Sequence, residues 1–249
     1  MSRYDHDSNK SCRSWYDDNY TDIFGYPNMK DFEKEYWIKY GLSEYFNSTD
    51  SVLDVGCGNG RFSNFFKTRA SKVVAIDPIM KINETFGAPN LHYHRSDFLK
   101  FQGDFDKNTG SKYDVILMLN VMCMFTMKNL GAPRSIKNHN PEGIQQAFIK
   151  INKLIVPGGH VVIAGDKARL LGEKNRYTQV THRAAFPRAG DVGEFPVDYP
   201  WEPEPTEEAC GNYNLPFLCD KYGFKMTMFG PSKNPRRFCA VITQTGDGQ

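Results

Sequence analysis

Short apolar runs alternate with amphipathic stretches through the middle of the chain. The apolar runs are rich in β-branched residues and predict strands at residues 51–56, 72–77, 91–97, 113–120 and 160–166. They show no clean alternation of polar and apolar positions, which is typical of strands covered on both faces of a sheet. Helical spacing predicts helices at residues 60–70 and about 141–154. Alternating strands and helices indicate an α/β fold with a doubly wound, mostly parallel sheet.

The N-terminal part of the chain has a different pattern. Residues 1–28 are rich in Asp, Asn, Ser and Tyr, which predicts a loose arm rather than a packed element. Residues 30–46 carry aromatic side chains mostly at three- to five-residue spacing, which predicts a helix whose later part Gly41 weakens. We therefore expect residues 1–48 to form an arm and a helical cover for the sheet.

The C-terminal part begins with a break in the pattern. Residues 168–205 are rich in Pro, Gly, charged and aromatic residues, and they are too few and too polar to hold a core of their own. A helix is expected to end near Tyr222, followed by strands at residues 224–229 and 238–243. We therefore expect an insertion at 168–205 and a helix with a strand hairpin in residues 206–249.

Composition and charge restrict the class of protein. The chain has 249 residues, 40% hydrophobic and 24% charged, which suits one buried α/β domain over residues 1–249. Its net charge of +2 gives no strong field for nucleic acid or for a membrane surface, although it does not exclude a nucleic-acid partner. No run approaches the ~18 apolar residues of a membrane span. The charge therefore favours a small-molecule ligand and no membrane partner.

The cysteines and the polar N-terminus predict a cellular location. The six cysteines form no CxxC pair and no Cys/His cluster, so neither a disulfide framework nor a structural zinc site is expected. The first residues are polar and charged, unlike a secretory signal. Both observations predict reduced thiols and a cytoplasmic protein.

A glycine-rich turn follows the first predicted strand and carries the strongest chemical signal. The glycines in Gly56–Gly60 are spaced G-x-G-x-G, and Arg61 stands where a dinucleotide-binding turn has its third glycine or alanine. The acid Asp54 precedes the turn, and its carboxylate would repel a pyrophosphate but attract a cation. S-adenosylmethionine (SAM) carries a sulfonium and an amino group and no phosphate. The turn therefore favours SAM over NAD.

With further motifs downstream, the chain resembles the class I SAM-dependent methyltransferases over about residues 50–166. Asp77 ends the second predicted strand about 20 residues after the turn, the spacing of an acid that binds a ribose hydroxyl. Three more matches are Ser96-Asp97-Phe98, the strand Tyr113–Val121 and the segment Ile155–Ile163. The resemblance implies a seven-stranded, mostly parallel sheet with an antiparallel C-terminal strand, a SAM-binding core in residues 50–166, and methyltransferase activity.

The resemblance also implies which residues bind the cofactor. Asp54 and the glycine turn would hold the methionyl part of SAM, Asp77 the ribose, and Asp97 with Phe98 the adenine. The predicted set is Asp54, Gly56, Cys57, Gly58, Asn59, Gly60, Asp77, Pro78, Asp97, Phe98, Asn120 and Val121. Structural alternatives stay open at this point, because Asp77 could cap a helix, Asp97 could cap a loop, and Asn120 could satisfy local backbone groups.

Catalytic residues are less well marked. Methyl transfer chiefly requires alignment of the acceptor atom with the methyl group, with a base where a proton must leave. His139, after the fourth motif, and His182, in the insertion, are the candidate bases, although each could be an exposed loop histidine. No metal is expected, because Asn120 rather than an acid accompanies Asp166 at the positions where some O-methyltransferases bind a cation.

The acceptor is the least determined part of the function. Asn120 is followed by Val121 rather than by the two prolines typical of adenine-N6 and glutamine methyltransferases. We expect transfer to an O or N atom of a small molecule, with residues 168–205 as a substrate lid. An RNA or protein methyltransferase is the alternative, because residues 167–188 are basic. A non-catalytic SAM-binding subunit is a second alternative, and the oligomeric state is not predicted.

Overall fold

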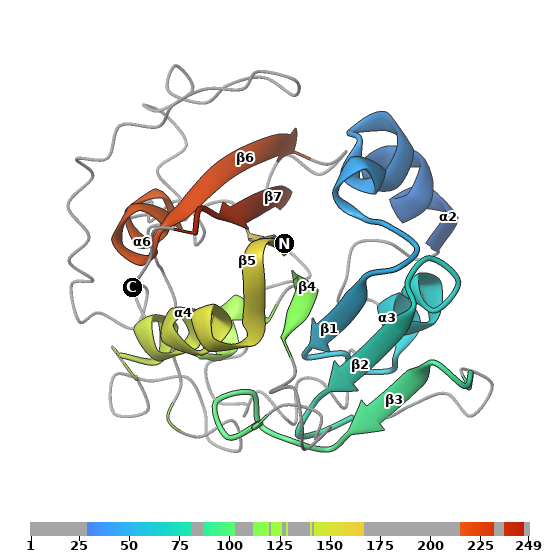
Figure 1. Ribbon diagram of the computed structural model, residues 1–249, viewed down its shortest axis with the longest axis horizontal. Coiled ribbons are helices and arrows are strands. Elements are labelled where there is room, and N and C mark those ends of the chain that lie inside the picture. Colours follow the sequence, from blue (N-terminus) through green and yellow to red (C-terminus); the bar gives the residue numbers. More distant parts are fainter. Residues whose placement is uncertain are drawn as a thin grey trace, which may run out of the picture.

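A computed structural model gives the fold of the chain. It describes residues 29–80, 87–102, 112–119, 121–125, 128, 140, 142–166, 215–231 and 237–246. In these ranges one sheet lies between helices on both sides (Figure 1). The predicted arm at 1–28 and insertion at 168–205 lie outside the described residues.

The sheet has seven strands in the order β3-β2-β1-β4-β5-β7-β6. The strands are β1 (Ser51–Val55), β2 (Lys72–Ile76), β3 (Leu91–His94), β4 (Tyr113–Leu119), β5 (Ile155–Asp166), β6 (Phe224–Pro231) and β7 (Arg237–Gln244). Neighbouring strands among β1 to β5 are parallel, and β7 is antiparallel to both β5 and β6. The doubly wound, mostly parallel sheet that the sequence predicts is confirmed.

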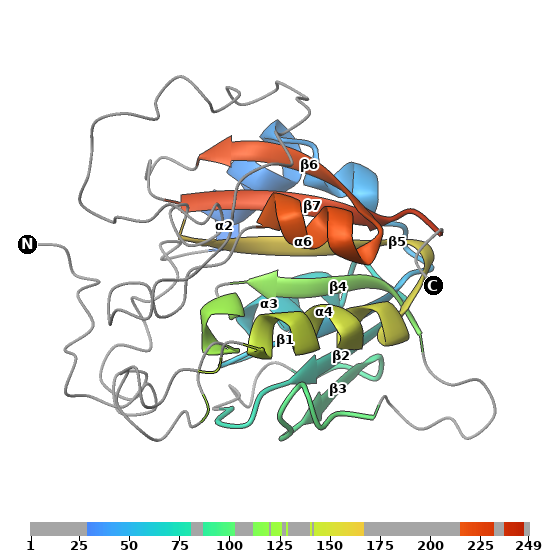
Figure 2. The ribbon, with the colours of Figure 1, turned by 90° about the vertical axis from the view of Figure 1, so that its left-hand side faces the viewer.

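Helices cover the two faces of the sheet (Figure 2). One face carries α4 (Gly143–Leu154) and α6 (Leu215–Tyr222), whereas the other carries the N-terminal segment and α3 (Arg61–Phe66). The N-terminal segment consists of α2 (Met29–Phe32), the π-helix η1 (Glu33–Lys39) and the 3-10 helix η2 (Leu42–Tyr45). A second short 3-10 helix, η3 (Met122–Met124), follows β4.

Each covered face has its own hydrophobic core. Phe148 and Ile151 of α4 are fully buried against the sheet together with Leu215 of α6. On the opposite face, Phe32 and Phe66 belong to a second cluster, in which aromatic rings pack among aliphatic side chains. Burial on both faces explains why the strands read as continuous apolar runs.

Some element boundaries differ from those predicted. The predicted helix over residues 30–46 is interrupted at Gly41, whose φ of 70° ends the helical path. α3 stops at Phe66 and β3 at His94, each shorter than its apolar pattern. β5 begins early, because Ile155 pairs with Tyr113 before a register shift in the β4–β5 ladder.

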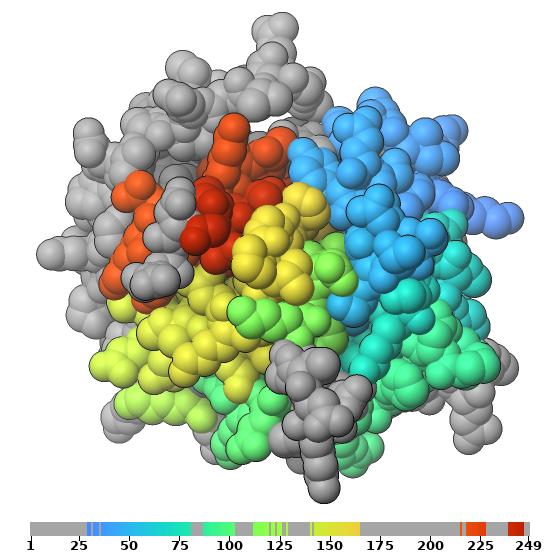
Figure 3. Space-filling model, in the orientation of Figure 1, coloured from blue at the N-terminus to red at the C-terminus, as the bar shows by residue number. Residues whose placement is uncertain are grey.

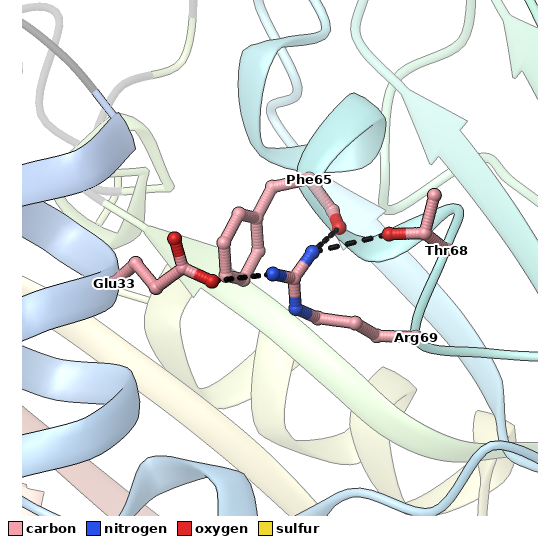
Figure 4. A network of polar contacts seen from close by, with 4 residues as sticks. All are labelled: Glu33, Phe65, Thr68 and Arg69. Carbon is pink, nitrogen blue, oxygen red and sulfur yellow. Dashed lines mark hydrogen bonds and ion pairs between the residues drawn. The ribbon is translucent and has the colours of Figure 1, made fainter.

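The N-terminal segment 29–46 lies beside α3 (Figure 3). A network around Arg69 joins the two (Figure 4). Arg69 Nη2 donates to Glu33 Oε1 at 2.5 Å, and Nη1 donates to the Phe65 carbonyl oxygen at 2.8 Å and to Thr68 Oγ1 at 3.1 Å. The guanidinium carbon lies 3.7 Å from the centroid of the Phe65 ring and 5.6 Å from that of Trp37. One side chain therefore joins η1 to α3.

Replacing Arg69 with alanine is expected to lower the free energy of unfolding by about 1–2 kcal/mol, because the ring contacts and the packing of the side-chain stem disappear with the hydrogen bonds. Glu33→Gln is the matched control, since it removes only an ion pair between partly exposed groups, worth less than about 1 kcal/mol. Urea denaturation followed by circular dichroism measures both variants. Equal losses would show that the ion pair, not the stacking, holds the segment.

Within the described ranges, none of the helices has the length and apolar content that crossing a membrane requires.

Candidate functional site

The carboxyl ends of the central strands meet at one edge of the sheet. Val55, the last residue of β1, pairs with Ile76, the last residue of β2, and Ile76 pairs in turn with His94 of β3. Gly56 and Asp77 therefore leave the sheet side by side. At this edge lies the boundary between β1 and β4, where the strand order reverses. Open α/β sheets bind ligands at such a point.

The backbone of the glycine turn requires glycine at three positions. Gly56, Gly58 and Gly60 have φ angles of 71°, 57° and 79°. These values lie in the left-handed region, which residues with a side chain adopt only at a cost. The G-x-G-x-G spacing is thus the sequence of a turn with alternate left-handed residues, and Gly60 is also the N-cap of α3.

The amide groups of this turn are bonded within the protein. The N–H groups of Gly56 and Cys57 donate to the carbonyl oxygen of Ile76 at 2.8 and 3.1 Å. The N–H of Gly58 donates to Asp77 Oδ2 at 3.1 Å. A phosphate held by a helix-capping turn needs such donors for its own oxygens.

The same holds at the start of α3. The N–H of Gly60 donates to the Cys57 carbonyl oxygen at 2.9 Å, and the N–H of Arg61 donates to Asn59 Oδ1 at 3.1 Å. The Gly58 amide is bonded to the Asp77 carboxylate, and the Arg61 amide is bonded to the Asn59 side chain. The turn is therefore poorly suited to a pyrophosphate. The geometry thus supports the preference against a dinucleotide that Arg61 and Asp54 indicate in the sequence.

Asp54 is a buried carboxylate behind the turn. Its side chain is 2% exposed, and the Ser63 hydroxyl of α3 donates to Oδ2 at 2.5 Å. The pKa of Asp54 is raised to about 6: burial is the main cause, the Ser63 hydrogen bond lowers the pKa, and the nearby charge of Asp77 raises it. In the part of the chain that the structure describes, no Lys or Arg forms an ion pair with Asp54.

Asp77 is half-buried and held in one orientation. Its Oδ2 accepts the Gly58 N–H, and its Oδ1 accepts the N–H of Ile79 at 2.6 Å. Burial raises the pKa of Asp77, while these two hydrogen bonds and the charge of Arg95 lower it. Each carboxylate oxygen keeps a second lone pair, so Asp77 can accept ligand hydroxyls without losing its backbone contacts.

The two acids together determine which ligand charge the site prefers. Asp54 and Asp77 repel each other, since each disfavours ionisation of the other where water is largely excluded. A cation between or beside them relieves that repulsion. Asp54 is therefore suited to the sulfonium and amino groups of SAM, and Asp77 is suited to its ribose hydroxyls.

The residues predicted for adenine lie in less distinctive surroundings. Asp97 Oδ1 accepts the Leu99 N–H at 2.8 Å, so this acid closes a local turn. The Phe98 ring is 4% exposed and lies 5.5 Å from the ring of Phe125 in the core on the α4 face. Their adenine contact stays a prediction, as does that of the exposed Pro78.

Other predicted site residues lie outside the described residues. These are Asn120, His139 and His182. Cys57 is 7% exposed, and burial raises the pKa of its thiol, so it is an unreactive part of the turn. Across the described side chains there is no group of three or more His, Cys, Asp or Glu residues that could hold a metal ion.

Two contributors to the site were missed in the sequence. Ser63, fully buried, is a polar residue within an apolar helical run, and this could have marked it as a partner of a buried acid. Tyr93 of β3 lies against the turn, since a β-carbon built on Gly60 would be 2.6 Å from its hydroxyl oxygen. No local pattern marks that contact, because it depends on how β3 lies beside β2.

Comparison with known proteins decides the family. A family model described as a methyltransferase domain matches residues 33–189. The chain belongs to the class I SAM-dependent methyltransferase family. Its methyl donor is accordingly SAM. A search of curated proteins gave no significant match.

Solved structures share the fold at low identity. The N-methyltransferase NodS from Bradyrhizobium japonicum WM9 in complex with S-adenosyl-L-homocysteine has a TM-score of 0.53 and 12% identity, over 94% of this chain and 99% of that chain. The 1,6-didemethyltoxoflavin-N1-methyltransferase from Burkholderia thailandensis has a TM-score of 0.51 and 14% identity, over 94% and 87%. The PH0226 protein from Pyrococcus horikoshii OT3 has a TM-score of 0.54 and 16% identity, over 92% and 98%.

Proposed function

We propose that this methyltransferase transfers the methyl group of SAM to an O or N atom of a small-molecule acceptor. One observation carries the cofactor half of the proposal: a buried acid, Asp54, and a half-buried acid, Asp77, lie at a turn in which the amides of Gly56, Cys57, Gly58 and Gly60 are already bonded. Such a site favours a cationic ligand with hydroxyl groups and disfavours a pyrophosphate.

Each part of the turn has a role toward SAM. When bound, SAM supplies an activated methyl group on a positively charged sulfur. Asp54 would attract the positive methionyl end, and the glycines of Gly56–Gly60 would let the ligand approach the backbone closely. Asp77, fixed by Gly58 and Ile79, would accept the ribose hydroxyls. The protein then aligns donor and acceptor and excludes water.

The small-molecule acceptor is supported by charge and by the fold. A net charge of +2 over 249 residues gives no strong overall field for a polyanion. A neighbour with the same fold was solved with 1,6-didemethyltoxoflavin bound, so this fold accommodates acceptors of that size. Where a proton must leave, His139 or His182 would accept it. The segment 168–205 would cover the acceptor.

Calorimetric titration of the purified protein with SAM, S-adenosylhomocysteine and NAD tests the cofactor site. Micromolar binding of the first two, with none for NAD, is the expected result. A screen of small hydroxyl and amine compounds with methyl-labelled SAM then tests the acceptor class. Label in RNA or protein but in none of the small molecules would contradict the proposed acceptor, and absence of SAM binding by folded protein would contradict the site.

Asp77→Ala is expected to weaken SAM binding by about 1.5–3 kcal/mol, because a hydrogen bond to a charged group is lost. Asp77→Asn should lose less, since it keeps one acceptor oxygen for a backbone amide. Asp220→Ala, which removes an exposed acid of α6, is the matched control and should bind SAM normally. Calorimetry measures all three, with circular dichroism to verify folding. Unchanged affinity of the alanine variant would remove Asp77 from the site.

A further inference from the structure

The glycine turn is held between two side chains, one from β3 and one from the segment that follows β4. A β-carbon built on Gly56 would lie 2.5 Å from Val121 Cγ2, just beyond β4. A β-carbon built on Gly60 would lie 2.6 Å from the Tyr93 hydroxyl oxygen and 3.1 Å from its Cε1 and Cζ atoms. The two ends of the turn therefore lie against different neighbours, and only glycine leaves room at either end.

Tyr93 reaches the turn from the strand beyond Asp77. It lies in β3, where it pairs with Ala75 of β2, and its half-buried ring packs against the aromatic cluster beneath α3. A packed ring is a stiff support, since its position is fixed by two torsions and many contacts. The Gly60 end of the turn thus rests on a rigid group.

The turn transmits this support to the ribose-binding acid. Between the two clamped ends lies Gly58, whose N–H holds Asp77 Oδ2 at 3.1 Å. If the Gly60 end moves, this hydrogen bond lengthens or bends, and the carboxylate loses its fixed orientation. A binding group must be held within about 0.5 Å to keep its full contribution.

We infer that Tyr93 is a positioning residue for SAM: its ring supports Gly60, keeps the Gly58 amide on Asp77, and so sets the ribose-binding geometry. This inference rests on the proposed function of Asp77. Tyr93 is not a catalytic base, because burial raises its pKa to about 12, and the charges of Cys57 and Asp54 act in the same direction. The phenol stays protonated at neutral pH, and the ring carries the effect.

Three variants separate positioning from general packing. Tyr93→Ala is expected to raise the SAM dissociation constant about tenfold, the equivalent of one hydrogen bond. Tyr93→Phe keeps the ring and should stay within about twofold of wild type. Leu91→Ala is the matched control, because Leu91 lies two residues earlier on β3 in the same cluster and is 7% exposed. It should lower the melting temperature without changing SAM affinity by more than about twofold.

A double-mutant cycle tests the contact itself without any ligand. Gly60→Ala should lower the melting temperature less in the Tyr93→Phe background than in wild type, because the closest atom is gone. Gly56→Ala is the matched control in the same turn, and its effect should be the same in both backgrounds, since its neighbour is Val121. Additivity of the Gly60 pair would overturn the proposed contact.

The binding data and the cycle distinguish the two ways of failing. Wild-type protein that does not bind SAM overturns the proposed function and the inference with it, whatever the cycle gives. SAM binding by wild type with an unchanged dissociation constant for folded Tyr93→Ala overturns the inference alone. A loss of affinity in Leu91→Ala as large as that in Tyr93→Ala also overturns it, because the effect would then be general packing.

Discussion

Gly143→Ala is expected to lower the free energy of unfolding by at least about 3 kcal/mol, at the upper end of what overpacking costs. A β-carbon at this position would lie 1.7 Å from the carbonyl oxygen of Phe125 and 2.7 Å from Asn140 Nδ2. The first of these atoms belongs to the backbone and cannot turn away as a long side chain could. Relief therefore requires α4 or the segment after β4 to move.

The position of Gly143 makes such a movement costly. It is the first residue of α4, is buried, and precedes Ile144 and Phe148, which anchor the helix in the core. Phe125 on the other side is 9% exposed and contacts Phe98 in the same core. Shifting either element opens cavities beneath it, and cavities cost stability in proportion to their size.

Urea denaturation followed by circular dichroism measures the effect of Gly143→Ala. Gly87→Ala is the matched control, since nothing lies within 4 Å of a β-carbon there and its φ is not left-handed. The control should stay within about 0.5 kcal/mol of wild type. A loss under about 1 kcal/mol in Gly143→Ala would mean that residues 121–125 move freely away from α4, contrary to the packing described.

Much of the sheet was predictable because its strands have clear ends. The β1 run stops at the glycine turn and the β2 run stops at Asp77-Pro78, so the predicted and observed bounds agree within a residue. Glycine and proline end regular structure for reasons that are local to the chain. The G-x-G-x-G spacing was informative for the same reason, since each glycine serves a left-handed backbone angle.

Elements determined by distant contacts were harder to predict. Aromatic residues recur every four positions at Phe32, Tyr36 and Tyr40, a pattern compatible with an α-helix, yet residues 33–39 form a π-helix. The rings contact one another at centroid distances of 5.9 and 5.7 Å, and the Phe32 ring packs on Phe62 and Phe65 of α3. Packing on α3, which is not visible in the local pattern, accompanies the wider helical turn.

The candidate site, like the fold, was predictable only where local sequence determines it. Asp54 and Asp77 stand out in the sequence, because Asp54 is an acid near the end of an apolar strand and Asp77 directly follows the next one. That the Asp77 carboxylate accepts the Gly58 amide depends on the register of β1 beside β2, which no local motif encodes. Phe98 depends on distant contacts in the same way, since its ring lies 5.5 Å from that of Phe125 in the core, and its adenine contact stays a prediction.

Asp54→Asn is expected to stabilise the protein above pH 6 while weakening SAM binding. Burial raises the pKa of Asp54 from an ordinary value of 3.8 to about 6, so the folded protein holds this proton more tightly than the unfolded chain does. Between those two pH values the folded state binds more protons, and stability therefore falls as the pH rises. The total loss is about 3 kcal/mol, and above pH 6 it is constant.

The asparagine variant removes that pH dependence. A neutral amide has no charge to desolvate, still accepts the Ser63 hydroxyl, and no longer repels Asp77. At pH 7 the free energy of unfolding of the variant should exceed that of wild type by up to about 3 kcal/mol, whereas at pH 4 the two should differ little. Urea midpoints at the two pH values measure this. Asp220→Asn, at an exposed acid of α6, is the matched control and should shift neither midpoint appreciably.

SAM binding should move in the opposite direction. The buried charge that costs stability is the charge that attracts the sulfonium and amino groups, so the variant should bind SAM at least about tenfold more weakly at pH 7. In wild type, SAM affinity should rise from pH 5 to pH 7 as Asp54 ionises, and the variant should lack this rise. A variant that is more stable yet binds SAM normally would show that the buried Asp54 charge, which costs stability, has some role other than SAM binding. If the same substitution destabilises the protein, the buried carboxylate is stabilised by its surroundings more strongly than its one described polar partner, Ser63, indicates.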